Sequence, residues 1–265
     1  MEAAFFDLDK TVIAKASMVA FSRRFRTAGM IDRRVLAVAV WNGLLFRWLG
    51  ADEKRMRKFR ESTLRITKGW DHAVVSALVR DALVDVIEPI VYAEALDLMQ
   101  MHREAGRLVF LVSASPEEIV TPLADHLGAD AAVASRAVLD AEGHYTGEVE
   151  LYAYGHEKVI AIERIAATHG IDLDASWAYS DSITDEPMLR AVGHPRAVNP
   201  DRELARLAAE EGWPVLHFTD LTAAPTPVRD RLRHPNRPFA VGATVLTIVG
   251  AIGVVWWSTR RRRAG

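Results

Sequence analysis

The chain has 265 residues, of which 50% are hydrophobic and 26% charged, and its formal net charge is −2. This length suffices for one large domain or for a domain with an insertion. The near-neutral charge argues against a general nucleic-acid-binding protein, which would carry a strong basic excess. The absence of cysteine excludes disulfides, thiolate zinc sites and a cysteine nucleophile. The amino terminus has neither a basic region nor a long apolar core, so we expect no signal peptide.

Two aspartates follow the first apolar run, Ala3–Phe6, which predicts a buried strand. Asp7 and Asp9 stand two residues apart, and residues at that spacing in an extended segment point the same way. Both carboxylates should therefore emerge at the carboxyl end of the strand, where open α/β sheets bind ligands. Because adjacent anions repel, the pair calls for a cation, a shared proton or phosphoryl transfer. An acidic strand-to-turn junction without a function is the alternative.

Residues 14–90 have apolar residues at helical spacing and no segment that predicts a strand. An apolar run, Val35–Phe46, and a basic amphipathic segment, Ala51–Arg65, lie within this stretch. Asp71 is placed to cap a helix over Ala73–Ile87. We interpret residues 14–90 as a helical cap inserted after the first strand.

Segments of helix and strand type alternate in the rest of the chain. Predicted helices cover Tyr92–Glu104, Glu117–Leu127, His156–His169, Asp185–Ala191 and Arg202–Glu211. Predicted strands cover Arg107–Val112, Ser176–Tyr179, Arg196–Asn199 and Trp213–Phe218, and a hairpin joins Ala131–Asp140 to His144–Leu151. Strands separated by helices imply a parallel sheet with right-handed crossovers. We therefore predict an α/β fold whose catalytic core comprises residues 1–13 and 91–219.

The carboxyl-terminal part predicts membrane attachment. After a linker rich in proline and arginine, residues 220–238, the segment Phe239–Ser258 contains no charge, and about twenty such residues can cross a bilayer as a helix. A basic tail, residues 259–265, follows. We predict a single-pass protein of the cell membrane, with a buried C-terminal helix as the alternative. Arginines flank both ends of the span, which leaves its orientation open, but the missing signal peptide favours a cytoplasmic catalytic domain.

Further polar residues are predicted at strand ends and helix starts. Ser113 ends its strand just before a helix that Pro116 opens, where a hydroxyl and free backbone amides suit a phosphate oxygen. Lys158 stands near the start of a helix, which the helix dipole does not favour for a cation. Taken singly, a capping serine and a solvated lysine explain these two better. Asp181 and Asp185 follow another strand, and Mg²⁺ prefers one or two carboxylates together with phosphate oxygens.

Together these residues resemble the four motifs of the haloacid-dehalogenase (HAD) superfamily. The resemblance rests on Asp7–Thr11 (Asp-Leu-Asp-Lys-Thr), Ser113, Lys158 and Ser180–Asp185 (Ser-Asp-Ser-Ile-Thr-Asp), in that order. The helical insertion resembles the type-1 cap of subfamily IB, which includes phosphoserine phosphatase. The chain is also similar to an actinobacterial group of this subfamily with a hydrophobic C-terminal tail. The resemblance implies a three-layer, Rossmann-like core.

The resemblance further implies a phosphomonoester hydrolase that forms an aspartyl-phosphate. Asp7 would be the nucleophile, and Asp9 would act as general acid and base. Thr11 and Ser113 would bind phosphate oxygens. Lys158 would neutralise charge on the nucleophile and on the phosphoryl group. This division of roles suits phosphoryl transfer, which depends on positioning and on charge neutralisation.

The implied cofactor is Mg²⁺, bound by the Asp7 carboxylate, the Asp9 backbone carbonyl and Asp181, with Asp185 in a supporting role. Phosphoserine phosphatases usually carry a glutamate where this chain has Ala16, so a small phosphorylated substrate is expected but its identity is open. A lipid-phosphate or other membrane-associated phosphatase is an alternative. An idle protein that binds a phosphorylated ligand is another. The sequence does not predict an oligomeric state.

A second departure from the phosphoserine phosphatases concerns the serine motif. Their serine is typically followed by two glycines, whereas this chain has Ala114 and Ser115 after Ser113. The difference leaves the predicted catalytic residues in place and again bears on the substrate.

Overall fold

A computed structural model of the chain describes residues 1–31, 64 and 66–222. The apolar run Val35–Phe46, most of Ala51–Arg65, and all of residues 223–265 lie outside the described residues. The membrane span Phe239–Ser258 and the basic tail therefore stay predictions. Among the helices that the structure describes, none combines the length and the apolar composition needed to cross a membrane.

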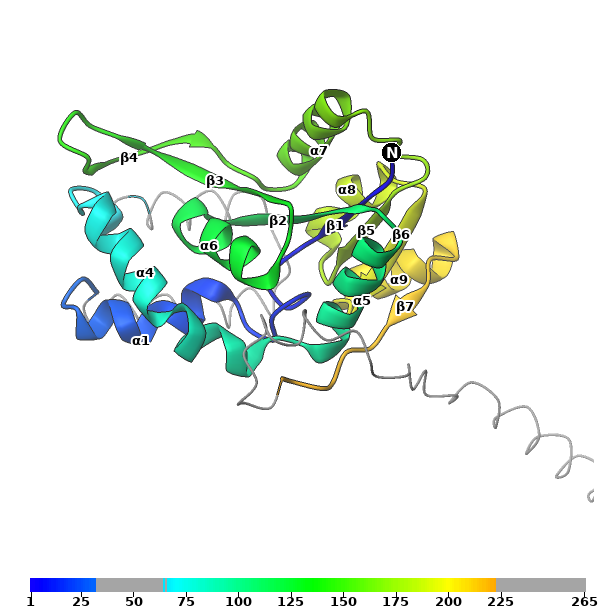
Figure 1. Ribbon diagram of the computed structural model, residues 1–265, viewed down its shortest axis with the longest axis horizontal. Coiled ribbons are helices and arrows are strands. Elements are labelled where there is room, and N and C mark those ends of the chain that lie inside the picture. Colours follow the sequence, from blue (N-terminus) through cyan, green and yellow to red (C-terminus); the bar gives the residue numbers. More distant parts are fainter. Residues whose placement is uncertain (32–63, 65, 223–265) are drawn as a thin grey trace, which may run out of the picture. The chain divides into compact units, whose positions relative to one another are not determined.

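Strands and helices alternate along the described chain, as Figure 1 shows. The strands are β1 (Ala3–Phe6), β2 (Leu108–Pro116), β3 (Ala131–Leu139), β4 (Tyr145–Leu151), β5 (Trp177–Ser180), β6 (His194–Val198) and β7 (Val215–Leu216). The α-helices are α1 (Ser17–Thr27), α4 (His72–Ile87), α5 (Ala93–Glu104), α6 (Glu117–Leu127), α7 (His156–His169), α8 (Glu186–Arg190) and α9 (Arg202–Glu211). Two short 3-10 helices are η1 (Glu88–Ile90) and η2 (Ile183–Asp185).

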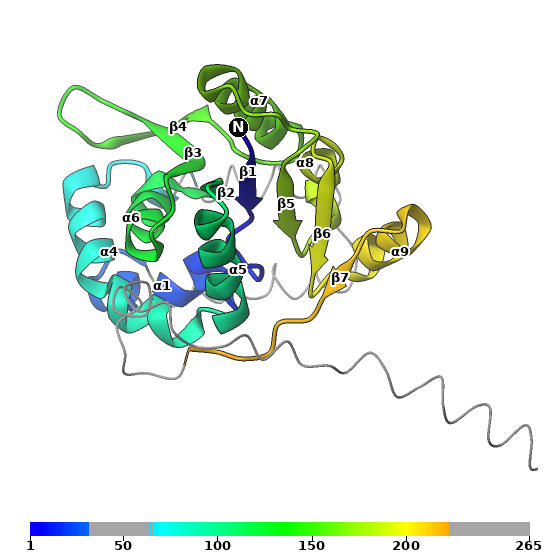
Figure 2. The same ribbon diagram turned by 45° about the vertical axis from the view of Figure 1, so that its right-hand side comes forward.

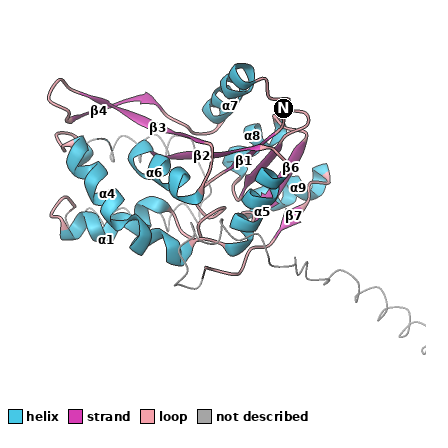
Figure 3. Cartoon of the chain, viewed as in Figure 1, coloured by secondary structure: helices cyan, strands magenta, loops and turns pink. Residues whose placement is uncertain are grey.

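The strands form one sheet in the order β4-β3-β2-β1-β5-β6-β7. Neighbouring strands are parallel except for β3 and β4, which form the antiparallel hairpin drawn in magenta in Figure 3. Figure 2 shows β1, β5 and β6 side by side and pointing the same way. The predicted mostly parallel α/β sheet is confirmed. The chain passes from β1 to β2 and β3 on one side and to β5, β6 and β7 on the other, so β1 lies at a topological switch point.

The two faces of the sheet bury separate hydrophobic clusters, because successive strand residues point to opposite faces. Ala4 and Phe6 belong to one cluster together with residues of α1, α4, α5 and α6. Ala3 and Phe5 belong to the other, together with residues of α7, α8 and α9. The sheet is therefore the middle of three layers. Within the helical segment after β1, α1 packs against α4, and α4 also packs on α6.

Local chemistry explains where several helices begin and end. Asp71 accepts hydrogen bonds from two amides of the first turn of α4, as predicted. Gly170 ends α7 in the left-handed conformation that glycine adopts without strain. The prediction that Pro116 is the first helical residue of α6 is wrong. Pro116 is the N-cap in an extended conformation, because β2 continues through it. Ser113 therefore lies within β2 rather than after it.

Candidate active site

Asp7 stands at the carboxyl end of the central strand. Its amide donates to the Tyr179 carbonyl oxygen at 2.9 Å, which continues the ladder between β1 and β5 by one residue. Beyond Asp7 the chain turns, and three later amides donate to the Leu8 carbonyl oxygen. Lys10 lies in this turn with a φ of 66°, which is uncommon for a residue other than glycine. A turn, and not one extended segment, therefore brings Asp9 to the same edge of the sheet as Asp7.

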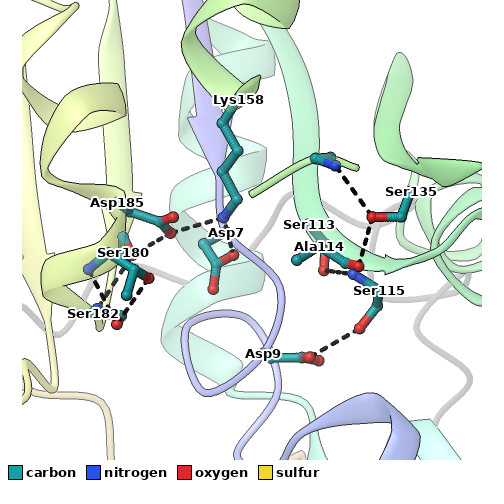
Figure 4. Close-up of polar contacts among 12 residues, drawn as sticks. Asp7, Asp9, Ser113, Ala114, Ser115, Ser135, Lys158, Ser180, Ser182 and Asp185 are labelled. Carbon is teal, nitrogen blue, oxygen red and sulfur yellow. Dashed lines mark hydrogen bonds and ion pairs between the residues drawn. The ribbon is translucent and has the colours of Figure 1, made fainter. Parts of the chain in front are cut away.

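A buried cation lies between two carboxylates on the β5 side of this edge (Figure 4). Lys158 Nζ, from the first turn of α7, donates to Asp7 Oδ1 at 2.6 Å and to Asp185 Oδ2 at 2.8 Å. Ser180 Oγ donates to Asp185 Oδ2 at 2.7 Å. All four side chains are buried. We call Asp7, Lys158, Ser180 and Asp185 the charged network.

Asp181 lies next to this network and carries little compensation for its charge. Its carboxylate is buried, and the ammonium group of Lys10 is 3.7 Å from its Oδ2. Burial raises the pKa of Asp181 to about 7, and the charge of Lys10 opposes this rise only in part. A further cation near Asp181 would favour the ionised form.

The titration of the charged network reflects burial and charge together. Burial raises the pKa of Asp7 well above its ordinary value, Lys158 opposes the rise, and Asp185 and Asp181 add to it. Burial lowers the pKa of Lys158, but Asp185 and Asp7 outweigh burial and hold this pKa above its usual value. One buried cation thus faces three carboxylates, which leaves an excess of negative charge.

This excess bears on the predicted magnesium site. In the part of the chain that the structure describes, no three histidine, aspartate or glutamate side chains form a metal-binding group. The predicted site needs only two carboxylates, those of Asp7 and Asp181, together with the backbone carbonyl of Asp9. Hard oxygen donors and uncompensated negative charge are what Mg²⁺ requires, so the residues present fit this ion.

Asp9 is held differently, by neutral donors on the β2 side. Its Oδ1 accepts a hydrogen bond of 2.8 Å from the Ser17 amide, and its Oδ2 accepts one of 3.0 Å from Ser115 Oγ. The hydroxyl oxygens of Ser17 and Ser115 are 2.8 Å apart. Burial raises the pKa of Asp9, while the hydrogen bonds from Ser17 and Ser115 act against this rise. We call Asp9, Ser17 and Ser115 the hydroxyl network.

Two more hydroxyl groups predicted to bind phosphate are buried. Thr11 Oγ1 has no hydrogen-bond partner among the described residues. Ser113 Oγ accepts a hydrogen bond of 3.1 Å from the Ser115 amide. A buried polar atom without a partner calls for an explanation, and an anionic oxygen of a ligand would accept the free proton of Thr11.

The sequence reasoning missed three residues of the site: Ser17, Ser115 and Ser180. A signal for Ser115 was present, because it follows Ser113 by two residues in what proves to be an extended segment. Ser180 directly precedes Asp181, which was singled out. Ser17 had no comparable signal, since its contact with Asp9 depends on where the turn after β1 places the helix.

The fold and the site define an α/β protein with paired carboxylates beyond the central strand of a mostly parallel sheet and a buried lysine bound to one of them. The chain belongs to the haloacid dehalogenase-like hydrolase family, whose family model matches residues 4–190. The resemblance noted from the motifs is therefore confirmed at the level of the family.

Relatives support the same assignment over nearly the whole chain. The inhibition of morphological differentiation protein of Streptomyces azureus is 45% identical over 98% of this chain and 94% of its own length. A probable phosphatase of Mycobacterium tuberculosis is 45% identical over 99% of this chain and 90% of its own. A solved phosphoserine phosphatase with an analogue of its phospho-aspartyl intermediate has a TM-score of 0.58 at 19% identity, covering 88% of this chain and 97% of that one. That structure bears on the fold alone.

Proposed function

We propose that this protein is a magnesium-dependent phosphomonoester hydrolase that works through an aspartyl-phosphate on Asp7. The observation that carries the proposal is the contact of 2.6 Å between Lys158 and Asp7 at the end of the central strand. A buried cation at this distance favours the anionic form of Asp7, which is the form that can attack phosphorus. The name of the mycobacterial relative, a probable phosphatase, points the same way.

In the first step a carboxylate oxygen of Asp7 forms a bond to phosphorus, and the bond from phosphorus to the ester oxygen breaks. Asp9 donates its proton to the departing oxygen. In the second step Asp9, now ionised, takes a proton from water, whose oxygen attacks the same phosphorus. The bond to Asp7 breaks, and inorganic phosphate leaves. Lys158 offsets negative charge in both steps, and Thr11 and Ser113 donate hydrogen bonds to phosphate oxygens.

Mg²⁺ would be held by the carboxylates of Asp7 and Asp181 and by the backbone carbonyl of Asp9, and it would supply positive charge beside the phosphoryl oxygens. Asp185 would act indirectly, through Lys158. Its carboxylate fixes the ammonium group of Lys158 and is itself fixed by the Ser180 hydroxyl. The chain's own lysine thereby stays aimed at Asp7.

The substrate class that we propose is a small phosphomonoester, as for the phosphoserine-phosphatase-like members of the family. Ala16 lacks the carboxylate with which phosphoserine phosphatases contact a substrate amino group, so phosphoserine itself is not assigned. A panel of soluble and lipid phosphomonoesters would separate a metabolite phosphatase from a lipid-phosphate phosphatase.

We also propose a membrane anchor over Phe239–Ser258, with the catalytic domain on the cytoplasmic side. The uncharged span and the arginines at both of its ends support the anchor. A chain ending at Pro235 should remain in the soluble fraction when the full chain sediments with membranes. Equal partitioning of the two chains would contradict the anchor.

The test of the enzymatic proposal is hydrolysis of a generic phosphomonoester by the wild type and by Asp7→Asn, each with and without Mg²⁺. We expect turnover only in the wild type with Mg²⁺, because the amide of the variant cannot act as the nucleophile. Equal activity of the two proteins would refute the assignment. A protein that binds phosphate but never turns over would instead prove to be the idle binding protein.

A further inference from the structure

The hydrogen bonds to Asp9 restrain both of its carboxylate oxygens. One oxygen accepts from the Ser17 amide in α1, and the other accepts from the Ser115 hydroxyl in β2. Figure 4 shows the bond from Ser115 to Asp9. Since the two donors come from separate elements, rotation of the carboxylate about its bond to the rest of the side chain would break at least one bond. Ser17 is fully buried and Ser115 nearly so, which makes each loss costly.

The two serine hydroxyl groups form a directed chain. A hydroxyl has one proton to donate, and Ser115 donates its own to Asp9. In the contact of 2.8 Å between the two serines, Ser17 is therefore the donor and Ser115 the acceptor. Ser17 thus fixes the orientation of the hydroxyl that in turn fixes Asp9.

The start of α1 explains why Asp9 accepts from a backbone amide. Helix starts leave amides without partners, which a side chain at the N-cap commonly satisfies. The N-cap here is Ala16, which has no group that could do so, and the amide of Ser17 bonds to Asp9 instead. A side-chain substitution cannot remove this amide, but it can remove the Ser115 hydroxyl.

We propose that Ser115 is a positioning residue for Asp9: its hydroxyl, oriented by Ser17, holds the carboxyl group where it can give its proton to the leaving oxygen. This inference rests on the proposed function. Ser115 stands where phosphoserine phosphatases typically have the second of two glycines, so a hydroxyl at this place distinguishes the present chain from them. Ser115 itself neither touches the substrate nor exchanges the proton.

The proposal predicts that the contribution of Ser115 depends on the leaving group. An alkoxide is a strong base and must be protonated as it departs, whereas 4-nitrophenolate leaves readily without a proton. kcat/KM covers the steps up to formation of the aspartyl-phosphate, in which Asp9 acts as the acid. A defect in positioning should therefore lower kcat/KM for an alkyl phosphomonoester far more than for 4-nitrophenyl phosphate, while a general loss of structure would lower both equally.

The experiment compares Ser115→Ala and Ser115→Gly with Ser115→Thr, which keeps the hydroxyl. We expect the alanine and glycine variants to lose about tenfold in kcat/KM for glycerol phosphate, which equals about 1.4 kcal/mol, and to change little for 4-nitrophenyl phosphate. The threonine variant should retain most of the wild-type kcat/KM for glycerol phosphate. The matched control is Ser135→Ala, because Ser135 Oγ donates to the backbone carbonyl of Ala114, next to Ser115, and not to Asp9.

An equal loss for both substrates, no loss for either, or no recovery with threonine would overturn the positioning role. If one variant fails to fold, the other still decides, since the criterion is the ratio between two substrates for one protein. Asp7→Asn, assayed alongside, separates a failure of this inference from a failure of the proposed function. An inactive Asp7→Asn with no leaving-group effect at Ser115 rejects this inference alone, whereas an active Asp7→Asn rejects the proposed function.

Discussion

The charged network and the hydroxyl network hold two carboxylates in opposite ways. Asp7 is bound to a full cation, the ammonium group of Lys158, whereas Asp9 is bound to an amide and a hydroxyl, which are neutral. A cation stabilises the ionised carboxylate strongly, while neutral donors leave the protonated form within reach. Burial raises the pKa of both aspartates, and Lys158 opposes this rise at Asp7 while an amide and a hydroxyl oppose it at Asp9. In the proposed mechanism these surroundings suit Asp7 to attack as the anion and Asp9 to carry a proton.

The origin of the two networks shows how the fold separates them. Lys158 and Asp185 come from α7 and η2, which lie on either side of β5 in the sequence. Ser17 and Ser115 come from α1 and β2. Since β1 has β5 on one side and β2 on the other, each carboxylate beyond β1 takes its partners from a different flank. The central position of β1 is what allows one short motif to place two carboxylates against different partners.

The largest effect is expected from breaking the charged network with Lys158→Met. Two buried carboxylates would then face each other without a cation, which costs roughly 3–5 kcal/mol of the free energy of unfolding. Phosphatase activity should fall about a thousandfold, since a charge that stabilises the transition state is lost. Thermal unfolding and kcat measure the two losses.

Two further variants give this test its controls. Arg164→Met removes an exposed cation from the same helix, α7, and should change neither quantity appreciably. Adding Asp185→Asn to Lys158→Met should restore part of the stability without restoring activity, because it removes one of the two unpaired charges. A double variant no more stable than Lys158→Met would show that the pair does not stabilise the network through charge.

A smaller effect concerns the pH dependence of stability. His102, buried in α5, lies 2.8 Å through its Nε2 from the Tyr179 hydroxyl, and burial lowers its pKa from 6.5 to about 4. Between these pH values the unfolded chain binds a proton at this residue and the folded chain does not. The free energy of unfolding should therefore fall as the pH is lowered, by at most about 1.4 kcal/mol per pH unit.

Replacing this histidine sharpens the comparison of the two networks. The raised pKa values of Asp7 and Asp9 have the opposite effect on stability. The folded chain retains protons on them that the unfolded chain releases, so they raise the free energy of unfolding as the pH is lowered. His102→Gln should flatten or reverse the slope of stability between pH 6.5 and about 4, and exposed His217→Gln should not. Denaturant titrations at several pH values measure the slope. An unchanged slope in His102→Gln would exclude His102 as its source.

Local signals in the sequence were enough to predict most of the fold. The helix His156–His169 was predicted at the bounds that α7 has, because its apolar spacing is regular and Gly170 ends it. The extent of β2 was not predicted, since Ser113, Ala114 and Ser115 have the polarity of a loop. They lie within β2 at an irregularity of its pairing with β3, which resumes at Pro116. A neighbouring strand, which the sequence alone does not place, decides such a case.

The charged residues of the candidate site could be predicted from the sequence, whereas the serine hydroxyl groups that bind Asp9 could not. Asp7, Asp9, Lys158 and Asp181 belong to motifs whose order and spacing can be read directly. The partners of Asp9 cannot be read from the sequence in this way, because Ser115 is 106 positions away from Asp9. Serine is a common surface residue, and only the packing of α1 and β2 at the edge of the sheet makes Ser17 and Ser115 informative.

The most direct test of the central claim is to capture the phosphoryl group on the protein. The full chain is mixed with Mg²⁺ and a phosphomonoester, quenched in acid and analysed by mass spectrometry of its peptides. We expect a base-labile phosphoryl group on the peptide that contains Asp7, and on that residue within it, with none in Asp7→Asn. A phosphoryl group on another residue, or hydrolysis with undiminished turnover in Asp7→Asn, would contradict the assignment of Asp7 as the nucleophile.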